Sequence, residues 1–384
     1  MIVLGGEYAP FREGLRKFIQ VIMTAMAIIQ RRVSDIPVWK IRRNGLVGGF
    51  ALFFVFIVLF SGRARGEGGC TTDCQFKGKT TVEDLITKQP LTDVRAFGAK
   101  GDGTADDTVA IQAALNFTEG VHGIVFFPHG TYKITSPLKI SPNVHVEGLG
   151  VGFGSVILPF KSSGMTIRGA DLKQYNGYGF RNRIKGVTIV MRNAPQFPAI
   201  AIDSAYTVKL EDLFVFDAGP GGGITIAGAN HVTVTDVSLY GVGKGAGIRI
   251  TDSDVKLYNM DIEGFHDGLV VQGDHGVQVL GGYIERNEEY AIKFQRAGFN
   301  TVIGARVATG SKQGTAVGFL AGSEHNTVIG SSLNGLGGPA TLRQDETSKN
   351  NLVINCDVRG GVVSAASTLA VWSEFGSGPP RGAP

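Results

Sequence analysis

The sequence predicts an all-β fold, a β-solenoid in which short strands stack coil upon coil, with a short capping helix at its N-terminal end. Two observations predict it: a repeat of 22–26 residues along the chain, and a high glycine content of 56 in 384 residues. Glycine at about twice its usual share, without the three-residue period of collagen, is typical of tight turns between short strands.

The repeat begins near residue 184 and carries a strand-like segment in each unit. The segments are "IKGVTIV" at Ile184, "VKLEDLFVF" at Val208, "VTVTDVSLY" at Val232, "VKLYNMDIE" at Val255, "VQVLGGYIE" at Val277, "VIGARVATG" at Val302, "VIGSSLNGL" at Val328 and "VINCDVRGG" at Val353. A second short strand follows in most units, at Ile224, Ile248, Leu269, Ile292 and Val317. Units of this length without a helix bury their inward residues only by stacking on the next unit. A leucine-rich repeat would need regular leucines and asparagines, and a propeller blade a period near forty.

Asparagine recurs just before these strands, at Asn230, Asn300, Asn326 and Asn350. Asparagine tolerates the left-handed backbone conformation, so it suits a sharp bend between parallel strands. Stacked asparagines can also share side-chain hydrogen bonds. Either role is architectural.

The stretch "GDGTADDTVAIQAALN" predicts the capping helix. Thr104 and Asp107 have the spacing of a capping box, and Val109, Ile111, Ala114 and Leu115 would form the buried stripe. Asp102, Asp106 and Asp107 are therefore interpreted as turn and helix-start residues, in preference to an acidic catalytic cluster or a metal loop.

The same stretch, extended to "VRAFGAKGDGTADDTVAIQAAL" and followed by "GIVFFPHGTYKI" at Gly123, resembles the opening signature of the pectate-lyase-like superfamily. The resemblance covers about residues 91–360. It implies a right-handed, single-stranded parallel β-helix of the pectin-lyase type and a carbohydrate-directed surface. It does not select among the hydrolases, lyases, epimerases and inactive proteins of that superfamily.

Residues 1–62 form a basic, apolar N-terminal segment. They hold eight Lys/Arg against three Asp/Glu, and the rest of the chain holds 29 against 30, so the net charge of +4 comes from this segment. Residues 46–62 carry no charge and follow Arg42 and Arg43, which predicts either a signal-peptide core or a membrane anchor, with residues 1–45 as the cytoplasmic or signal n-region. A buried core helix is the weaker alternative, and Met23 or Met26 are alternative starts. Residues 63–90 are expected to be a linker and residues 361–384 a C-terminal tail.

The expected location is outside the cytoplasm, as a secreted, periplasmic or membrane-anchored protein. Cys70 and Cys74 would then form a disulfide or stay free, and Cys356 is expected to be a buried apolar residue. The balanced charge of the folded part predicts no nucleic-acid partner. The expected partners are a polysaccharide and, if the apolar segment is uncleaved, a membrane; a homotrimer stays open.

The candidate catalytic residues are Asp267, Glu288, Glu289 and His266. "HDGLVV" resembles the Asp-Gly-Ile element of polygalacturonases, with Asp267-Gly268-Leu269, and Glu288 and Glu289 follow one coil later. The next coil has "SKQGTAV" instead of Gly-His-Gly, which is a departure from that family. Carboxylates on adjacent coils, about 4.8 Å apart, fall within reach of the separations of about 5–9.5 Å that glycosidases use. His266 or His275 would transfer protons near neutral pH.

The candidate substrate-binding residues are Arg249, Lys293 and Tyr290. The outward residues of the second strands should form a column, Thr225, Arg249, Val270, Lys293, Gly318 and Arg343. Arg249 and Lys293 would match carboxylates of an acidic sugar chain, and Tyr290 would stack on a sugar ring. No metal centre or other cofactor is expected; calcium on Asp252 and Asp254 is the weaker alternative.

The predicted function is an exported enzyme acting on a uronate-containing polysaccharide, as a lyase, hydrolase or epimerase. The alternative is a non-catalytic β-helix module that binds or helps assemble extracellular polysaccharide. An enzyme should bring Asp267, a glutamate and a histidine or arginine into one site, whereas a structural module should scatter them. A phage tailspike is disfavoured by the apolar N-terminal segment.

Overall fold

The computed structural model describes residues 91–152, 154–169, 181–336, 340–365 and 369–372. The expectations for residues 1–90, including the apolar segment and Cys70 and Cys74, lie outside these residues. No helix in the described part is both long and apolar enough to cross a membrane.

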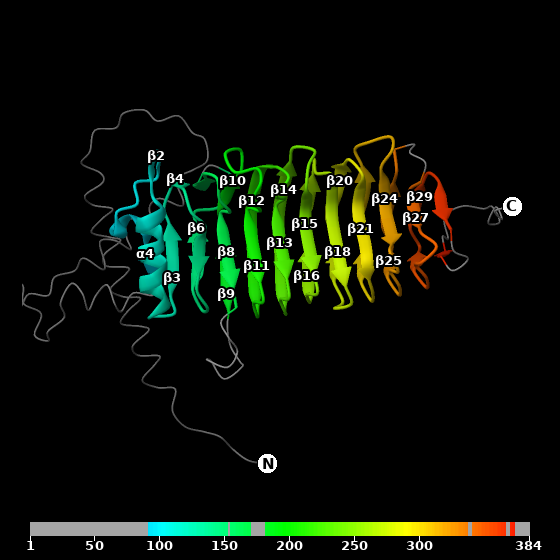
Figure 1. The fold of residues 1–384 in the computed structure, drawn as a ribbon, viewed down its shortest axis with the longest axis horizontal. Coiled ribbons are helices and arrows are strands. Elements are labelled where there is room, and N and C mark those ends of the chain that lie inside the picture. The colour runs from blue at the N-terminus through cyan, green and yellow to red at the C-terminus, as the bar shows by residue number, and fades with distance from the viewer. Residues whose placement is uncertain (1–90, 153, 170–180, 337–339, 366–368, 373–384) are drawn as a thin grey trace, which may run out of the picture. The chain divides into compact units, whose positions relative to one another are not determined.

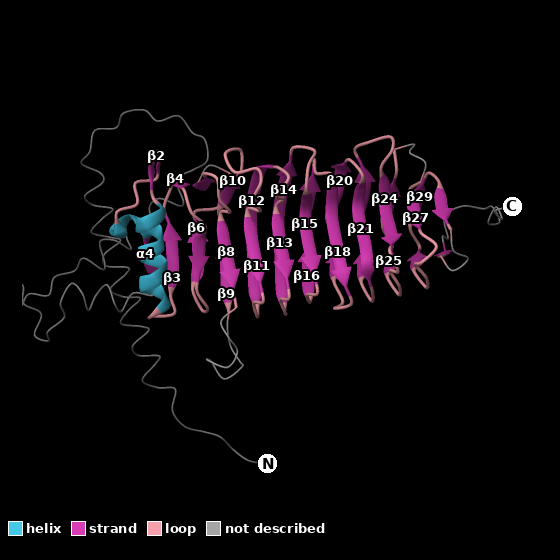
Figure 2. Ribbon diagram, viewed as in Figure 1, coloured by secondary structure: helices cyan, strands magenta, loops and turns pink. Residues whose placement is uncertain are grey.

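The described chain is a parallel β-solenoid, in which each full coil contributes strands to three ladders (Figures 1 and 2). The first ladder is formed by β1 (Leu91–Asp93), β3 (Ile124–Phe127), β6 (His145–Gly148), β9 (Asn182–Lys185), β12 (Val208–Ala218), β14 (Val232–Gly241), β16 (Val255–Tyr258), β19 (Gln278–Leu280), β22 (Thr301–Ile303), β25 (Thr327–Ile329), β28 (Leu352–Ile354) and β31 (Ala370–Trp372). The second ladder is formed by β2 (Asp102–Asp106), β4 (Gly130–Ile134), β7 (Ser155–Pro159), β10 (Thr188–Val190), the later halves of β12 and β14, β17 (Asp261–Glu263), β20 (Tyr283–Asn287), β23 (Arg306–Thr309), β26 (Ser332–Asn334) and β29 (Asp357–Arg359). The third ladder is formed by β5 (Leu138–Ile140), β8 (Met165–Arg168), β11 (Ile200–Asp203), β13 (Ile224–Ala227), β15 (Ala246–Thr251), β18 (Asp267–Gly273), β21 (Tyr290–Ala297), β24 (Thr315–Leu320), β27 (Leu342–Gln344) and β30 (Val362–Ser364).

The register of the third ladder confirms the predicted stacking. Ile224, Ile248, Leu269, Ile292 and Val317 are successive Cα partners, and all are fully buried. Burial of each such side chain contributes about 1.5–3 kcal/mol. The register of the predicted outward column is confirmed as well, since Thr225, Arg249, Val270, Lys293, Gly318 and Arg343 are partners in the same order. The expected exposure was wrong for Val270 and Gly318, which are buried. Position along one coil therefore fixes position on the next.

The turn between the first and second ladders is a sharp bend with a left-handed residue. In one coil it is Asn259 at φ 49°, between β16 and β17; in the next it is Gly281 at φ 68°. Because only glycine and, less often, asparagine or aspartate visit this conformation readily, these residue types recur at the bend.

Three buried asparagines form a hydrogen-bonded ladder elsewhere in the coil. The Asn300 Nδ2 donates to Asn326 Oδ1 at 2.7 Å, and the Asn326 Nδ2 donates to Asn351 Oδ1 at 2.9 Å. The shared side-chain hydrogen bonds were predicted, but the members were partly wrong. Asn350 is exposed at φ 57°, so its neighbour Asn351 occupies the ladder, and Asn230 lies outside it and is exposed. In this part of the coil the residue with left-handed backbone conformation, such as Asn350, is the one directly before the ladder asparagine.

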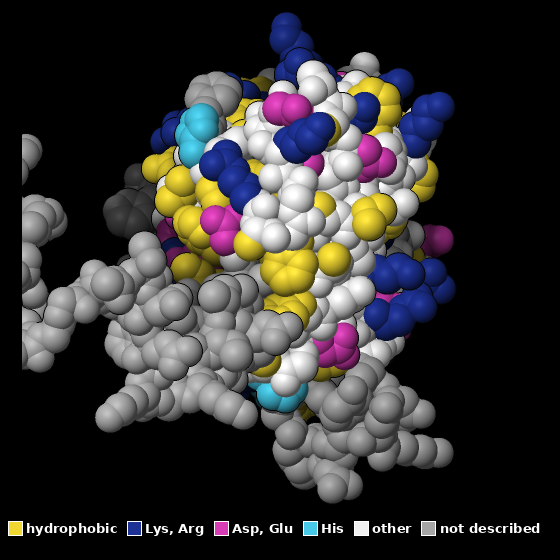
Figure 3. All heavy atoms as spheres, turned by 90° about the vertical axis from the view of Figure 1, so that its left-hand side faces the viewer, with side chains coloured by type: hydrophobic (Ala, Val, Ile, Leu, Met, Phe, Trp, Pro, Cys, Tyr) yellow, Lys and Arg dark blue, Asp and Glu magenta, His cyan; other side chains and the backbone are white. Residues whose placement is uncertain are grey.

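The helix α4 (Thr108–Glu119) lies at the end of the solenoid that carries the first coil, next to the short 3-10 helix η1 (Val94–Phe97). Its Ile111, Ala114 and Leu115 are buried as predicted, whereas Val109 is 81% exposed, so the expected stripe was wrong at that position. Its role as a cap over that end stays a prediction, because residues 1–90 lie outside the described part. Acidic, basic and apolar side chains are interspersed on this end (Figure 3).

The aspartates before the helix hold turns, as predicted, but not through a capping box. Thr104 lies in β2, and Asp107 is the N-cap residue without a side-chain cap bond. Its carboxylate instead accepts from the backbone N–H groups of Lys100 and Gly101, at 2.7 and 3.0 Å. Backbone donors from Ala105 and Thr104 lower the pKa of Asp102 to about 2.

The C-terminal boundary of the solenoid lies further along the chain than expected. β30 and β31 pair in parallel with β27 and β28, so strands continue to Trp372 instead of ending near residue 360. Cys356 is buried as expected, and burial raises the pKa of its thiol.

Candidate functional site

Two turns on consecutive coils bring four of the predicted residues together at the N-terminal ends of β18 and β21, two neighbouring strands of the third ladder. The backbone N–H of Glu289 donates to the carbonyl of His266 at 2.8 Å, so the turns before β18 and β21 lie directly over one another. The buried Asn287 holds both: its Oδ1 accepts from Phe265 N at 3.0 Å and its Nδ2 donates to Ile262 O at 3.2 Å. This stacking places His266 and Asp267 beside Glu289.

The "DGL" motif has a packing reason for its glycine. A Cβ on Gly268 would lie 2.5 Å from the Ala291 carbonyl oxygen and 2.6 Å from Asn287 Nδ2. Real Cβ contacts are not this short, so only glycine allows the two turns to approach. The motif is thus a structural requirement of the turn that carries Asp267.

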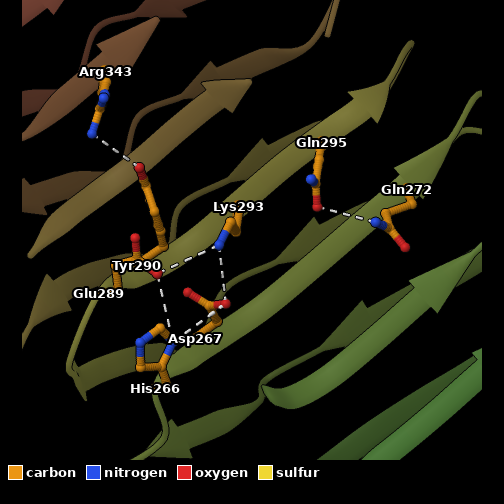
Figure 4. A network of polar contacts seen from close by, with 8 residues as sticks. All are labelled: His266, Asp267, Gln272, Glu289, Tyr290, Lys293, Gln295 and Arg343. Carbon is orange, nitrogen blue, oxygen red and sulfur yellow. Dashed lines mark hydrogen bonds and ion pairs between the residues drawn. The ribbon is translucent and has the colours of Figure 1, made fainter. Parts of the chain in front are cut away.

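The resulting cluster contains His266, Asp267, Glu289 and Lys293 (Figure 4). The Lys293 Nζ lies 3.3 Å from Asp267 Oδ2 and 3.5 Å from Glu289 Oε2. The His266 Nδ1 faces the same two oxygens, at 3.7 and 3.6 Å. One cation and one imidazole therefore share two carboxylates.

The four side chains form two layers of different exposure. Asp267 is 10% exposed and Lys293 18%, whereas His266 and Glu289 are each 47% exposed. One carboxylate oxygen of Asp267, Oδ1, is buried without a hydrogen-bond partner among the described residues. Asp267 and Lys293 thus form the floor, and His266 and Glu289 are the groups that a ligand would contact.

Tyr290 is buried and packs against Lys293 of the cluster. Its ring is not accessible to a sugar, so the predicted stacking role was wrong. It is 4% exposed, and its ring lies over Gly318, where an added Cβ would come within 2.5 Å of Cε1. Lys293 Nζ lies 4.7 Å from the ring centroid, and Arg343 donates to the phenol oxygen at 3.4 Å. Burial raises the pKa of Tyr290, so the phenol stays protonated at neutral pH.

Glu288 does not join the cluster. Its side chain is exposed and turned toward Gly243, where an added Cβ would lie 2.5 Å from Oε1. Arg249 is exposed on the third ladder two coils before Lys293, about 10 Å away at the usual strand spacing. His275 is also exposed, in the loop after β18.

The cluster also has the residue types of a metal site. Ligand atoms of His266, Asp267 and Glu289 lie within 4.8 Å of one another, the one such group in the described part of the chain. However, Lys293 already brings a positive charge into contact with both carboxylates. A divalent ion bound there would be repelled by this ammonium group, so we assign charge neutralisation to Lys293. Asp252 and Asp254 do not belong to the group.

Sequence reasoning missed the supporting residues. Arg343 and Gly318 were placed in the correct column but not connected with Tyr290, because their contact depends on a ring lying across one coil. Asn287 was missed as well. A signal existed, since it directly precedes the two glutamates and the coil repeats place it next to the preceding turn.

Comparisons with known proteins agree with this architecture. A model of the right-handed β-helix region matches residues 222–372. The model of the rhamnogalacturonase A/epimerase, pectate lyase-like family matches residues 91–293, more than half of the chain. The chain belongs to this family, and its fold is the right-handed, single-stranded parallel β-helix that the sequence predicts.

Curated relatives match over short segments. A glucan 1,3-beta-glucosidase of Cochliobolus carbonum is 38% identical over 72 residues, 19% of this chain and 9% of the relative. The mannuronan C5-epimerase AlgE1 of Azotobacter vinelandii is 42% identical over 67 residues, 15% of this chain and 5% of the relative. The matches thus span less than a tenth of either relative's length. Among solved structures, the A-module of the Azotobacter vinelandii mannuronan C-5 epimerase AlgE4 superposes with a TM-score of 0.54 at 18% identity, covering 73% of this chain and 94% of that one. This likeness concerns the fold alone.

Proposed function

We propose that this protein acts on a uronate-containing polysaccharide and removes the C5 proton of a uronate residue, as a lyase or an epimerase. The observation that carries the proposal is the layered cluster, in which exposed His266 and Glu289 lie over the Asp267–Lys293 pair. The names of the relatives, which include epimerases and glucosidases, support action on a polysaccharide. Export, expected from residues 46–62, is part of the proposal.

In this proposal His266 acts as the base. Its Nδ1 faces both carboxylates, so a neutral ring with its proton on Nδ1 has Nε2 free to accept a proton. The Asp267 and Glu289 carboxylates stabilise the imidazolium that forms. Asp267 acts through His266 and Lys293 and is a positioning residue.

The reaction needs positive charge as well. When the C5–H bond breaks, its electron pair delocalises into the adjacent carboxylate group of the sugar, and a nearby cation stabilises this anion. Lys293 is the cation within the cluster. Arg249, two coils away on the same ladder, is suited to pair with the carboxylate of a neighbouring sugar residue.

Two outcomes are open to the anion. In an epimerase, a water molecule on the opposite face returns a proton to C5, and the His266 imidazolium releases the abstracted proton to solvent. In a lyase, the C5 electron pair forms the C4=C5 double bond, the C4–O bond breaks with its electrons leaving on oxygen, and this oxygen takes a proton from the His266 imidazolium or from water. Each route conserves atoms and charge without an added oxidant.

Hydrolysis is the second candidate, because carboxylate oxygens of Asp267 and Glu289 lie within 4.8 Å, close to the separation of about 5–5.5 Å in retaining glycosidases. A glycosidase needs both carboxyl groups at the scissile bond. Asp267 is only 10% exposed and is paired with Lys293, so only Glu289 reaches a substrate freely. Proton abstraction therefore fits the cluster better.

The test is incubation of the purified full chain with polymannuronate, polygalacturonate and a neutral β-glucan in D2O, followed by proton NMR. Loss of the H5 signal with a changed sugar configuration would identify an epimerase, and new unsaturated ends a lyase. New reducing ends with H5 intact would show hydrolysis and overturn the proposal. Binding of a polymer without any chemical change would overturn it in favour of the binding module.

A further inference from the structure

A pocket of about 230 Å³ lies on the second ladder, lined by Arg306, Val307, Ala308, Ser332, Asn334 and Arg359. These residues come from β23, β26 and β29, whereas the His266 cluster is built at β18 and β21 of the third ladder. The two sites therefore belong to different sheets of the solenoid.

The pocket results from small side chains between two long ones. In register, Arg306 is followed by Ser332 on the next coil, and Ala308 by Asn334 and then Arg359. Ala308 is 8% exposed and lies between the two arginines, whereas the side chain of Val307 is fully buried in the core. The two arginines, 62% and 67% exposed, stand at the sides.

Each arginine at the pocket is paired with one carboxylate and retains donor groups that this pairing does not use. Arg306 contacts Glu285 through Nε at 3.0 Å, which leaves its terminal NH2 groups without a partner among the described residues. Arg359 contacts Asp357 through Nε and Nη2, so its Nη1 remains as a hydrogen-bond donor for a ligand. The Oδ1 of Asn334 accepts from Leu336 N at 2.9 Å, so its amide nitrogen remains as a donor. Ser332 adds a hydroxyl group.

A cavity lined by guanidinium, amide and hydroxyl donors is complementary to an anionic oxygen group. Planar guanidinium groups bind carboxylates with two parallel hydrogen bonds. The volume is below the roughly 300–1,000 Å³ of sites that enclose a drug-sized ligand. It therefore fits one charged group or one sugar residue of a chain.

An exposed tyrosine adjoins this pocket. Tyr283 is 51% exposed and is the register partner of Arg306 on the preceding coil. The polar tip and apolar ring of an exposed tyrosine suit contact with a sugar ring. The row Tyr283, Arg306, Ser332 thus places an exposed ring beside guanidinium and hydroxyl donors, and its next member, Asp357, is the carboxylate that pairs with Arg359.

We infer that this pocket binds the carboxylate of an acidic sugar residue and serves as a non-catalytic anchor for the polymer. The choice of a uronic acid rests on the proposed function, whereas the anion site rests on the lining residues alone. Bound polymer would contact a second face of the solenoid without reaching His266.

The test is isothermal titration of the full chain with sodium glucuronate, glucose and sodium sulfate. We expect glucuronate to bind, glucose not to bind, and affinity for glucuronate to fall about tenfold or more in Arg306→Gln and Arg359→Gln. Arg192→Gln is the matched control, because Arg192 is an exposed arginine that also pairs through Nε, with Asp217 at 3.1 Å. Ser332→Leu fills the pocket and keeps both arginines, so it should also abolish binding.

Three results would overturn the inference: no glucuronate binding by the wild-type chain, equal affinities in Arg306→Gln and Arg192→Gln, or binding of sulfate without glucuronate. Thermal unfolding of each variant checks that it is folded. The failure of this site is distinguishable from failure of the proposed reaction, because C5 proton exchange on short substrates depends on His266 and not on Arg306.

Discussion

The ammonium group of Lys293 lies 3.3 Å from a carboxylate oxygen of Asp267, on the neighbouring strand of the third ladder, and both side chains are largely shielded from water. A carboxylate in such a position depends on its partner, because its charge is poorly solvated. The pair therefore links the stability of two coils to the geometry of the candidate site.

Removal of the lysine charge should destabilise the protein. In Lys293→Met the side-chain stem is kept, but Asp267 loses its cation, so we expect the free energy of unfolding to fall by about 3 kcal/mol. Urea denaturation measures this change. The control is Lys349→Met, whose pair with Glu324 at 3.4 Å is exposed and should contribute less than about 1 kcal/mol. The double variant Lys293→Met, Asp267→Asn should recover part of the loss; no recovery would contradict the pairing.

The asparagine ladder should be a larger source of stability than an exposed asparagine. Asn326→Ala removes the hydrogen-bond partner of the Asn300 amide nitrogen, the Asn351 amide oxygen and the Ala297 carbonyl, all of them buried, which should cost about 2–4 kcal/mol. Asn116→Ala on the exposed side of α4 removes one hydrogen bond from Gln112 and should change stability by less than about 0.5 kcal/mol. Equal losses in the free energy of unfolding for the two variants, measured by chemical denaturation, would contradict a stabilising role for the ladder.

Asp102 should behave as a turn residue and not as a catalyst. Backbone hydrogen bonds lower its pKa from 3.8 to about 2, so NMR titration of its carboxyl group should give a midpoint near that value. Because the folded-state pKa is the lower one, its stabilising contribution is present above about pH 3.8 and is lost as the pH falls through about 2. Asp102→Asn should remove this contribution and leave the reaction rate unchanged. A strong loss of activity in a folded Asp102→Asn protein would contradict this assignment.

The two adjacent glutamates provide a matched comparison of position. Glu289→Gln removes a carboxylate that faces His266 at 3.6 Å, and we expect the turnover rate to fall about 10²-fold or more. Glu288→Gln changes a carboxylate turned toward Gly243 and should leave the rate within about twofold, since it makes no contact with the reacting groups. Steady-state kinetics on the polymer that the wild-type protein converts measure both turnover rates. Equal effects of the two substitutions would contradict the placement of Glu289 in the site.

Much of the fold was predictable because every coil of a solenoid repeats nearly the same arrangement of strands and turns. Ile224, Ile248, Leu269 and Ile292 are recognisable as partners from spacing alone, since coils of nearly constant length keep the register. The same regularity predicted the column that holds Arg249 and Lys293. Local exceptions were harder: the shift from Asn350 to Asn351 depends on which residue takes the left-handed turn, and spacing does not specify this.

The sequence was enough to predict which residues meet in the candidate site, but not which of them are exposed and which are buried. Adjacent turns bring Asp267, His266 and Glu289 together, and the coil repeat is enough to infer that. Which side chains are exposed depends on rotamers and on Tyr290 lying across Gly318. For the same reason neither the divergence of Glu288 from Glu289 nor the burial of Tyr290 followed from the sequence.

The most direct test of the account is the rate of C5 hydrogen–deuterium exchange in a uronate polymer, measured by NMR for the wild-type chain, His266→Gln and His275→Gln. Both histidines are exposed, but only His266 faces the carboxylates of Asp267 and Glu289. The account predicts exchange in the wild type and in His275→Gln, and a loss of about 10²-fold or more in a folded His266→Gln protein. Exchange at the wild-type rate in His266→Gln would contradict the assignment of this cluster as the active site.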